Sequence, residues 1–73
     1  MKLEDCKIGG RVRDNIALPV VNQGAGTIIG FCKNVHGQDN ITIEWDKARS
    51  VISYGHEYLI KVSSVWPGNV DAI

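Results

Sequence analysis

The sequence predicts one all-β domain, folded as a five-stranded antiparallel barrel. The chain has 73 residues, which is the size of one small domain. Its apolar residues fall in short segments that alternate with polar residues or are rich in β-branched and aromatic side chains, separated by turns. Closing the sheet into a barrel would remove the exposed edges that so short a chain cannot otherwise cover.

Five short segments are expected to form the strands. They are residues 11–13, 27–32, 41–45, 50–54 and 60–62. The clearest is 41–45, where Ile41, Ile43 and Trp45 alternate with polar residues and therefore face one side. Gly30, in the middle of the second segment, predicts a bulge or a sharp bend, which small barrels use at their corners.

The connections between these strands are expected to be mostly tight. Short turns or loops are expected at three places, residues 24–26, 35–40 and 46–49. Residues 56–59 are too few for a real helix and predict one 3₁₀ turn before the last strand. Residues 63–73 are expected to be a C-terminal tail in which Trp66 packs on the barrel end or on another subunit.

Residues 14–23 are expected to form a long loop between the first two strands. Pro19 lies among the apolar residues, and a proline cannot donate a hydrogen bond to a central strand. The placement of the apolar residues Val20 and Val21 is open to two interpretations. In the one we favour, the loop folds back on the core; in the other, its apolar tips are exposed and meet a partner.

The balance of charge argues against non-specific binding of nucleic acid. Eight basic and eight acidic residues give a formal net charge of zero, whereas phosphate binding needs basic residues gathered on one surface. The candidate residues for such a patch are Arg11, Arg13, Lys33, Lys47 and Arg49. Acidic residues interrupt them, so a mixed, solvated surface is the simpler expectation.

No metal site, cofactor or membrane span is expected. The chain has no C-x-x-C motif and no apolar run long enough for a signal peptide or a transmembrane segment, which predicts a cytoplasmic protein. Cys6 and Cys32 are expected to be reduced structural thiols, although the sequence leaves a disulfide between them open. His36 and His56 are expected to be exposed loop residues, because neither has an evident catalytic partner.

Four stretches of the chain resemble a known family of folds. They are G-R-V-R at 10–13, G-T-I-I-G-F at 26–31, I-T-I-E-W-D at 41–46 and E-Y-L-I-K-V at 57–62. Together they resemble the SH3-like barrels of the KOW and Tudor kind. The resemblance implies an SH3-like barrel, but this fold hosts many unrelated activities and so does not imply one function.

Part of the chain also resembles the plasmid-encoded type II dihydrofolate reductases, which are short SH3-like chains that form a tetramer around one pore. The stretches that carry this resemblance are G-R-V-R at 10–13, G-T-I-I-G-F-C at 26–32, S-V-I-S-Y at 50–54 and L-I-K-V at 59–62. The family's V-Q-I-Y strand, whose glutamine and isoleucine contact folate and nicotinamide, corresponds to Val51-Ile52-Ser53-Tyr54. Tyr54 is kept, whereas Ile52 replaces the glutamine and Ser53 replaces the isoleucine. Isoleucine has no amide to hydrogen-bond the pterin, so the resemblance implies kinship of fold without reductase activity.

The aromatic residues offer one further binding hypothesis. Tudor-like barrels bind methylated lysine or arginine in an aromatic cage, and Trp45, Tyr54 and Tyr58 would have to converge to form one. The simpler expectation is that Trp45 and Phe31 belong to the core of so small a protein.

Three hypotheses of function follow from these observations. The leading one is a non-enzymatic interaction module that binds a protein partner or itself, with Val20, Val21, Arg49, Tyr54 and Trp66 as the contact residues. The second is a nucleic-acid-binding barrel that uses the five basic residues above, with Tyr54 for stacking. The third is an enzyme resembling the type II reductases. No catalytic residue is assigned.

Overall fold

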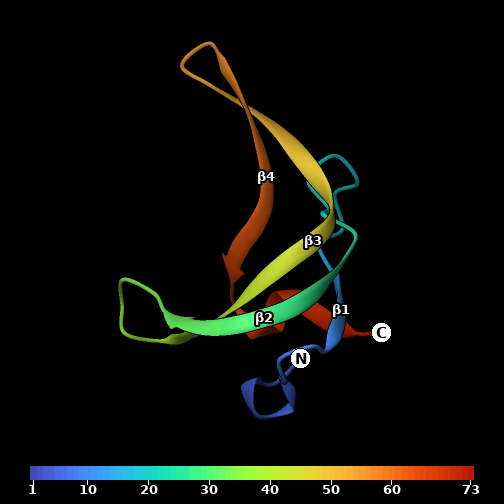
Figure 1. Ribbon diagram of the computed structural model, residues 1–73, viewed down its shortest axis with the longest axis vertical. Helices are drawn as coiled ribbons and strands as arrows, with labels where there is room; N and C mark the ends of the chain where they lie inside the picture. The colour runs from blue at the N-terminus through green and yellow to red at the C-terminus, as the bar shows by residue number, and fades with distance from the viewer.

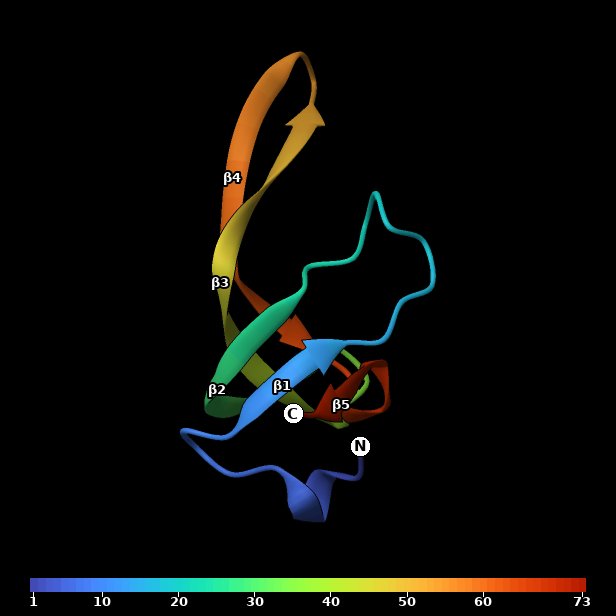
Figure 2. The same cartoon turned by 90° about the vertical axis from the view of Figure 1, so that its right-hand side faces the viewer.

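The structure is a computed structural model of residues 1–73, and it is all-β, as predicted. Its elements in chain order are η1 (Leu3–Asp5), β1 (Arg11–Asp14), β2 (Ala25–Lys33), β3 (Asp39–Ser53), β4 (His56–Val65), η2 (Pro67–Asn69) and β5 (Val70–Ala72). The five strands form one antiparallel sheet in the order β4-β3-β2-β1-β5 (Figures 1 and 2). β4 and β5 are the two edge strands, and closure into a barrel stays a prediction.

The hydrophobic core is small and lies where β1, β2, β5 and the first part of β3 come together. Its members are Cys6, Val12, Ile28, Ile41, Ile43, Trp45 and Val70. The predicted alternation along 41–45 is confirmed, since Ile41, Ile43 and Trp45 are buried while Glu44 is exposed. Phe31 is half-exposed, so its expected place in the core is wrong. β1 pairs only with residues 25–27 of β2, and Phe31 lies beyond the part of β2 that β1 covers.

Two irregularities bend the long strands. The register between β2 and β3 shifts between Ile28 and Gly30, which confirms the predicted bulge. The register between β3 and β4 shifts between Glu44 and Arg49, so that residues 45–48 lie opposite Lys61 alone. The predicted turn at 46–49 is therefore wrong. The chain bulges there and continues, and the segments predicted as separate strands at 41–45 and 50–54 form one strand, β3, which ends at Ser53.

The C-terminal part of the chain also differs from the prediction. Residues 56–59 belong to β4, and the 3₁₀ turn before the last strand is η2 instead. Residues 63–73 are not a tail: they complete β4 and form η2 and β5, and Val70 enters the core opposite Asp14. No helix of the structure is long and apolar enough to cross a membrane.

Beyond the bulge, β3 and β4 leave the rest of the molecule as a two-stranded hairpin. We call residues 49–60 the arm, and the remainder of the sheet with its loops the body. The arm extends along the long axis, away from both termini (Figures 1 and 2). The molecule measures 39 × 27 × 21 Å along its principal axes, and this elongation reflects the arm.

Candidate interaction site

The arm has two faces, which follow from its ladder of paired residues. Arg49 pairs with Ile60, and the pairs continue through Ser50–Leu59, Val51–Tyr58, Ile52–Glu57 and Ser53–His56. Because directly opposed residues in an antiparallel ladder share a face, Val51, Tyr58 and Ile60 lie on one face. Ile52 and Leu59 lie on the other.

Several apolar side chains of the arm are largely exposed. The exposed fraction is 76% for Ile52 and 72% for Leu59, and Tyr58 is half-exposed. No residue of the arm is buried. An isolated two-stranded hairpin is at best marginally stable in water, and exposed apolar patches on a small protein mark contact surfaces. The arm therefore has the composition of a surface that another molecule covers.

The tip of the arm is a strained two-residue turn. Tyr54 and Gly55 have φ values of 50° and 76°, the positive signs that a type I′ hairpin turn requires at both central positions. Tyr54 is the only non-glycine residue of the chain with positive φ, and 98% of it is exposed. A left-handed conformation costs roughly 1–2 kcal/mol for a residue with a Cβ. The turn thus presents an aromatic ring to solvent at a cost in stability, as strained residues at contact sites do.

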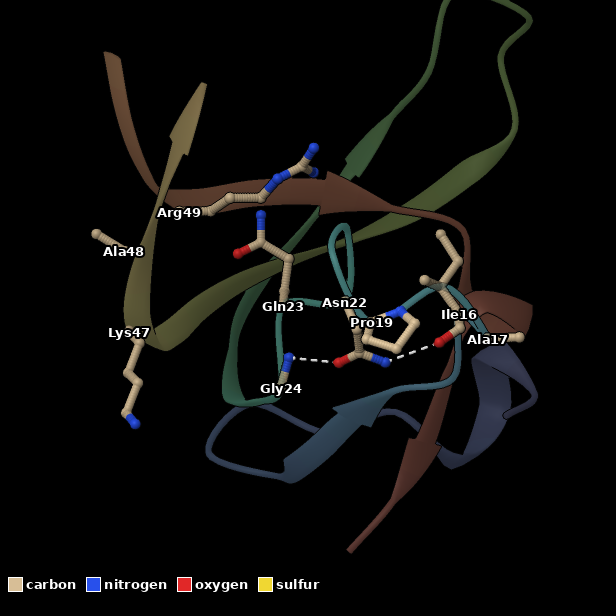
Figure 3. A pocket seen from close by; sticks show the side chains of 9 residues that line it. All are labelled: Ile16, Ala17, Pro19, Asn22, Gln23, Gly24, Lys47, Ala48 and Arg49. Carbon is tan, nitrogen blue, oxygen red and sulfur yellow. Dashed lines mark hydrogen bonds between the residues drawn. The ribbon is translucent and has the colours of Figure 1, made fainter. Parts of the chain in front are cut away.

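A groove separates the base of the arm from the loop between β1 and β2 (Figure 3). Its volume is about 570 Å³, and it is lined by Ile16, Ala17, Pro19, Asn22, Gln23, Gly24, Lys47, Ala48 and Arg49. The loop holds its shape through the Asn22 amide, which donates to the carbonyl of Ile16 at 2.8 Å. The same side chain accepts from the backbone of Gly24 at 2.7 Å.

A smaller cavity of about 180 Å³ shares lining residues with this groove and reaches the core. Gln23, Trp45 and Arg49 all contribute to its lining. Gln23 Oε1 and Trp45 Nε1 are buried without a hydrogen-bond partner, and buried polar groups are normally paired. The cavity is large enough for water molecules that would satisfy these two groups.

Two of the five basic residues considered for nucleic-acid binding are paired with carboxylates. Arg11 donates to Asp46 Oδ1 at 2.7 Å and to Thr27, and Lys33 forms a salt bridge with Asp39. The hydrogen bond from Arg11 lowers the pKa of the Asp46 carboxyl below its usual value, and Lys61 adds a smaller effect in the same direction. Among the five residues, only Lys47 and Arg49 share the lining of the groove.

The five residues predicted to bind a partner do not form one surface. Val20 is exposed at the turn of the β1–β2 loop, so the interpretation in which this loop packs on the core is wrong there. Val21 and Arg49 line the same small cavity. Tyr54 lies at the tip of the arm, and the half-exposed Trp66 precedes η2, over Gly68.

The aromatic cage is not formed. Trp45 is buried in the body with 1% of its surface exposed, while Tyr54 lies in the turn that follows the far end of β3. His36 and His56 are exposed, as predicted, but His56 begins β4 and does not lie in a loop. Both cysteines are free thiols, and burial raises the pKa of Cys6.

The structure adds Ile52, Tyr58 and Leu59 to the candidate surface, and the sequence contained a signal for them. Gly55 follows Tyr54 between two segments of β-type composition, which is the pattern of a two-residue hairpin. Asparagine or aspartate usually precedes glycine in such turns, and the tyrosine obscured the pattern.

Comparisons with known proteins do not assign this site. A scan against protein-family models, a search of curated proteins and a search of solved structures each found no match to the chain.

Proposed function

We propose that this chain is a non-enzymatic interaction module whose arm binds another protein chain. The observation that carries the proposal is the exposure of Ile52 and Leu59 on a hairpin that contributes no residue to the core. Burying such side chains against the body would stabilise the monomer, at about 25 cal/mol for each Å² of apolar surface removed from water. Instead the arm holds them away from the body, where a partner can cover them.

The free edge of the arm supports the same proposal. β4 pairs with β3 on one side only, and an unpaired strand edge is a template for strand addition by another polypeptide. Nucleic acid is less well supported as the ligand, because Arg11 and Lys33 already pair with carboxylates. The arm itself carries Arg49 as its only Lys or Arg residue, which is too little charge for phosphate binding.

Site-specific photo-crosslinking tests the proposal. A photoreactive phenylalanine analogue replaces Leu59 in one variant and Val35 in the control. Val35 is 95% exposed in the β2–β3 loop, so the control probe is at least as accessible. We expect the Leu59 probe to give a discrete protein–protein product in the native host, and the Val35 probe to give none. The absence of any discrete product from the arm, or equal products from both positions, would contradict the proposal.

A further inference from the structure

We infer that the arm's partner is a second copy of this chain, paired antiparallel through the free edge of β4 about a two-fold axis at Leu59. This inference rests on the proposed function, since it names the occupant of the same surface. Pairing of the two β4 strands would join the two sheets into one continuous sheet across the arms.

The free edge of β4 carries few of the devices that protect edge strands. Natural edges are shortened, bulged outward, or carry proline and charged side chains, especially lysine. β4 has ten residues without a proline. From His56 to Val62 its only charged side chains at neutral pH are Glu57 and Lys61, which lie four residues apart. The irregularity of the β3–β4 pair lies in β3, at residues 45–48, and leaves the free side of β4 unprotected.

The spacing of the two charges selects one register. A two-fold axis perpendicular to an antiparallel pair must place one residue opposite its own copy, because opposed residues share a face. With Leu59 on the axis, Glu57 lies opposite Lys61 of the second copy, and the reverse pair forms by symmetry. With Glu57 or Lys61 on the axis, like charges would meet, which is destabilising. With Tyr58 or Ile60 on the axis, Leu59 would oppose a charged side chain.

The same register also pairs the apolar side chains. Leu59 lies opposite Leu59 of the second copy on one face. Tyr58 lies opposite Ile60 of the second copy on the other face, and an aromatic residue against a β-branched one is a favourable cross-strand pair. One register thus pairs the opposite charges and places Tyr58, Leu59 and Ile60 opposite apolar side chains.

The register also brings the tip of each arm to the base of the other. Counting from Leu59, the turn residues Tyr54 and Gly55 reach the level of Ser64 and Ser63 of the second copy. The two β4 strands then pair over residues 56–62. This pairing would place the strained and exposed Tyr54 beside the partner's body.

Charge exchange tests the pairing. In sedimentation equilibrium we expect a dimer for the unchanged chain. Glu57→Lys or Lys61→Glu alone should raise the dissociation constant about tenfold, because each creates two like-charge pairs. The double variant Glu57→Lys/Lys61→Glu should restore the dimer, which a merely structural effect would not do. A monomer at every concentration up to about 1 mM, the weakest affinity in the usual range, or a double variant no tighter than the single ones would overturn the inference.

A cysteine at the axis tests the register independently. In a Cys32→Ser background, Leu59→Cys should form an intermolecular disulfide under mild oxidation, since Cβ atoms of opposed residues approach to the distance a disulfide needs. Tyr58→Cys is the matched control, because its two copies lie diagonally and should not bond. A stronger crosslink from Tyr58→Cys than from Leu59→Cys would exclude this register.

The photo-crosslink separates failure of this inference from failure of the proposed function. A product with twice the mass of the chain supports the second copy. A product between the arm and a different protein overturns the inference and leaves the interaction module standing. No product overturns both.

Discussion

The body and the arm are built from the same two strands, β3 and β4, yet they use apolar residues in opposite ways. In the body, Ile43 and Trp45 are almost fully buried between neighbouring strands. A few residues further along β3, Ile52 is mostly exposed with only β4 beside it. The bulge at residues 45–48 separates the part of β3 with buried apolar residues from the part where they are exposed. Position in the fold, more than composition, therefore decides whether an apolar side chain stabilises the monomer or remains available for contact.

The largest expected difference comes from one substitution made in both regions. Ile43→Ala should lower the free energy of unfolding by about 2–5 kcal/mol, because it leaves a cavity in the core. Ile52→Ala should change the monomer's stability by no more than about 0.5 kcal/mol, as at other surface sites. Denaturant unfolding at low protein concentration measures both. Equal losses for the two variants would mean that the arm packs as part of the fold.

Alanine substitutions at one glycine of the body and one of the arm extend the comparison to the backbone. A Cβ at Gly26 would lie 2.7 Å from Ile43 and 2.9 Å from the carbonyl oxygen of Glu44, so Gly26→Ala should cost about 1–3 kcal/mol through overpacking. A Cβ at Gly55 would meet nothing within 4 Å. Gly55→Ala should therefore cost about 1–2 kcal/mol, through its positive φ alone. The same unfolding experiment measures both losses, and tolerance of alanine at Gly26 would contradict the close packing of β2 on β3.

A substitution at the tip of the arm is expected to stabilise the protein, in contrast to those above. Asparagine adopts positive φ more readily than tyrosine and suits the first position of a type I′ turn. Tyr54→Asn should therefore stabilise the hairpin by about 0.5–1 kcal/mol, seen as slower amide hydrogen exchange near the tip. If Tyr54 lies against a partner, the same variant should weaken that contact. Faster exchange at the tip would show that the tyrosine ring stabilises the turn.

The smallest effect is electrostatic and belongs to the body. Arg11 holds the pKa of Asp46 below its usual value, so the pair stabilises the fold above the pKa that Asp46 has in the unfolded chain. This contribution is lost as the pH falls through the lower folded-state pKa. Both side chains are exposed, so the effect on stability should be small. NMR titration of the Asp46 carboxyl should show a midpoint that rises in Arg11→Gln, and an unchanged midpoint would contradict the pairing.

The sequence was informative where local pattern and tertiary structure agree. The alternation of Ile41, Ile43 and Trp45 predicted a half-buried strand, and Gly30 predicted a bulge, because both signals arise within one strand. The arm was missed because Asp46–Arg49 has the composition of a turn but forms a bulge opposite Lys61. Pairing with the partner strand determines whether such a segment becomes a turn or a bulge. Similarly, nothing local indicates that Val70 pairs beside β1 and enters the core.

The candidate site was predicted only in part for the same reason. Tyr54 was singled out as an aromatic contact residue, and the structure places it at the tip of the arm. Ile52 was assigned to a short strand of a closed barrel, where one face is buried, and Leu59 to a 3₁₀ turn. Their exposure results from the length of the β3–β4 hairpin beyond the body, which depends on pairing between distant residues.

Removing the arm tests most directly the claim that the body folds by itself while the arm makes the contact. In this variant an Asn-Gly turn replaces residues 50–59 and joins Arg49 to Ile60. We predict that it keeps the amide NMR pattern of β1, β2 and β5, and that light scattering gives the mass of a monomer at concentrations where the whole chain associates. An unfolded spectrum, or association equal to that of the whole chain, would contradict the account.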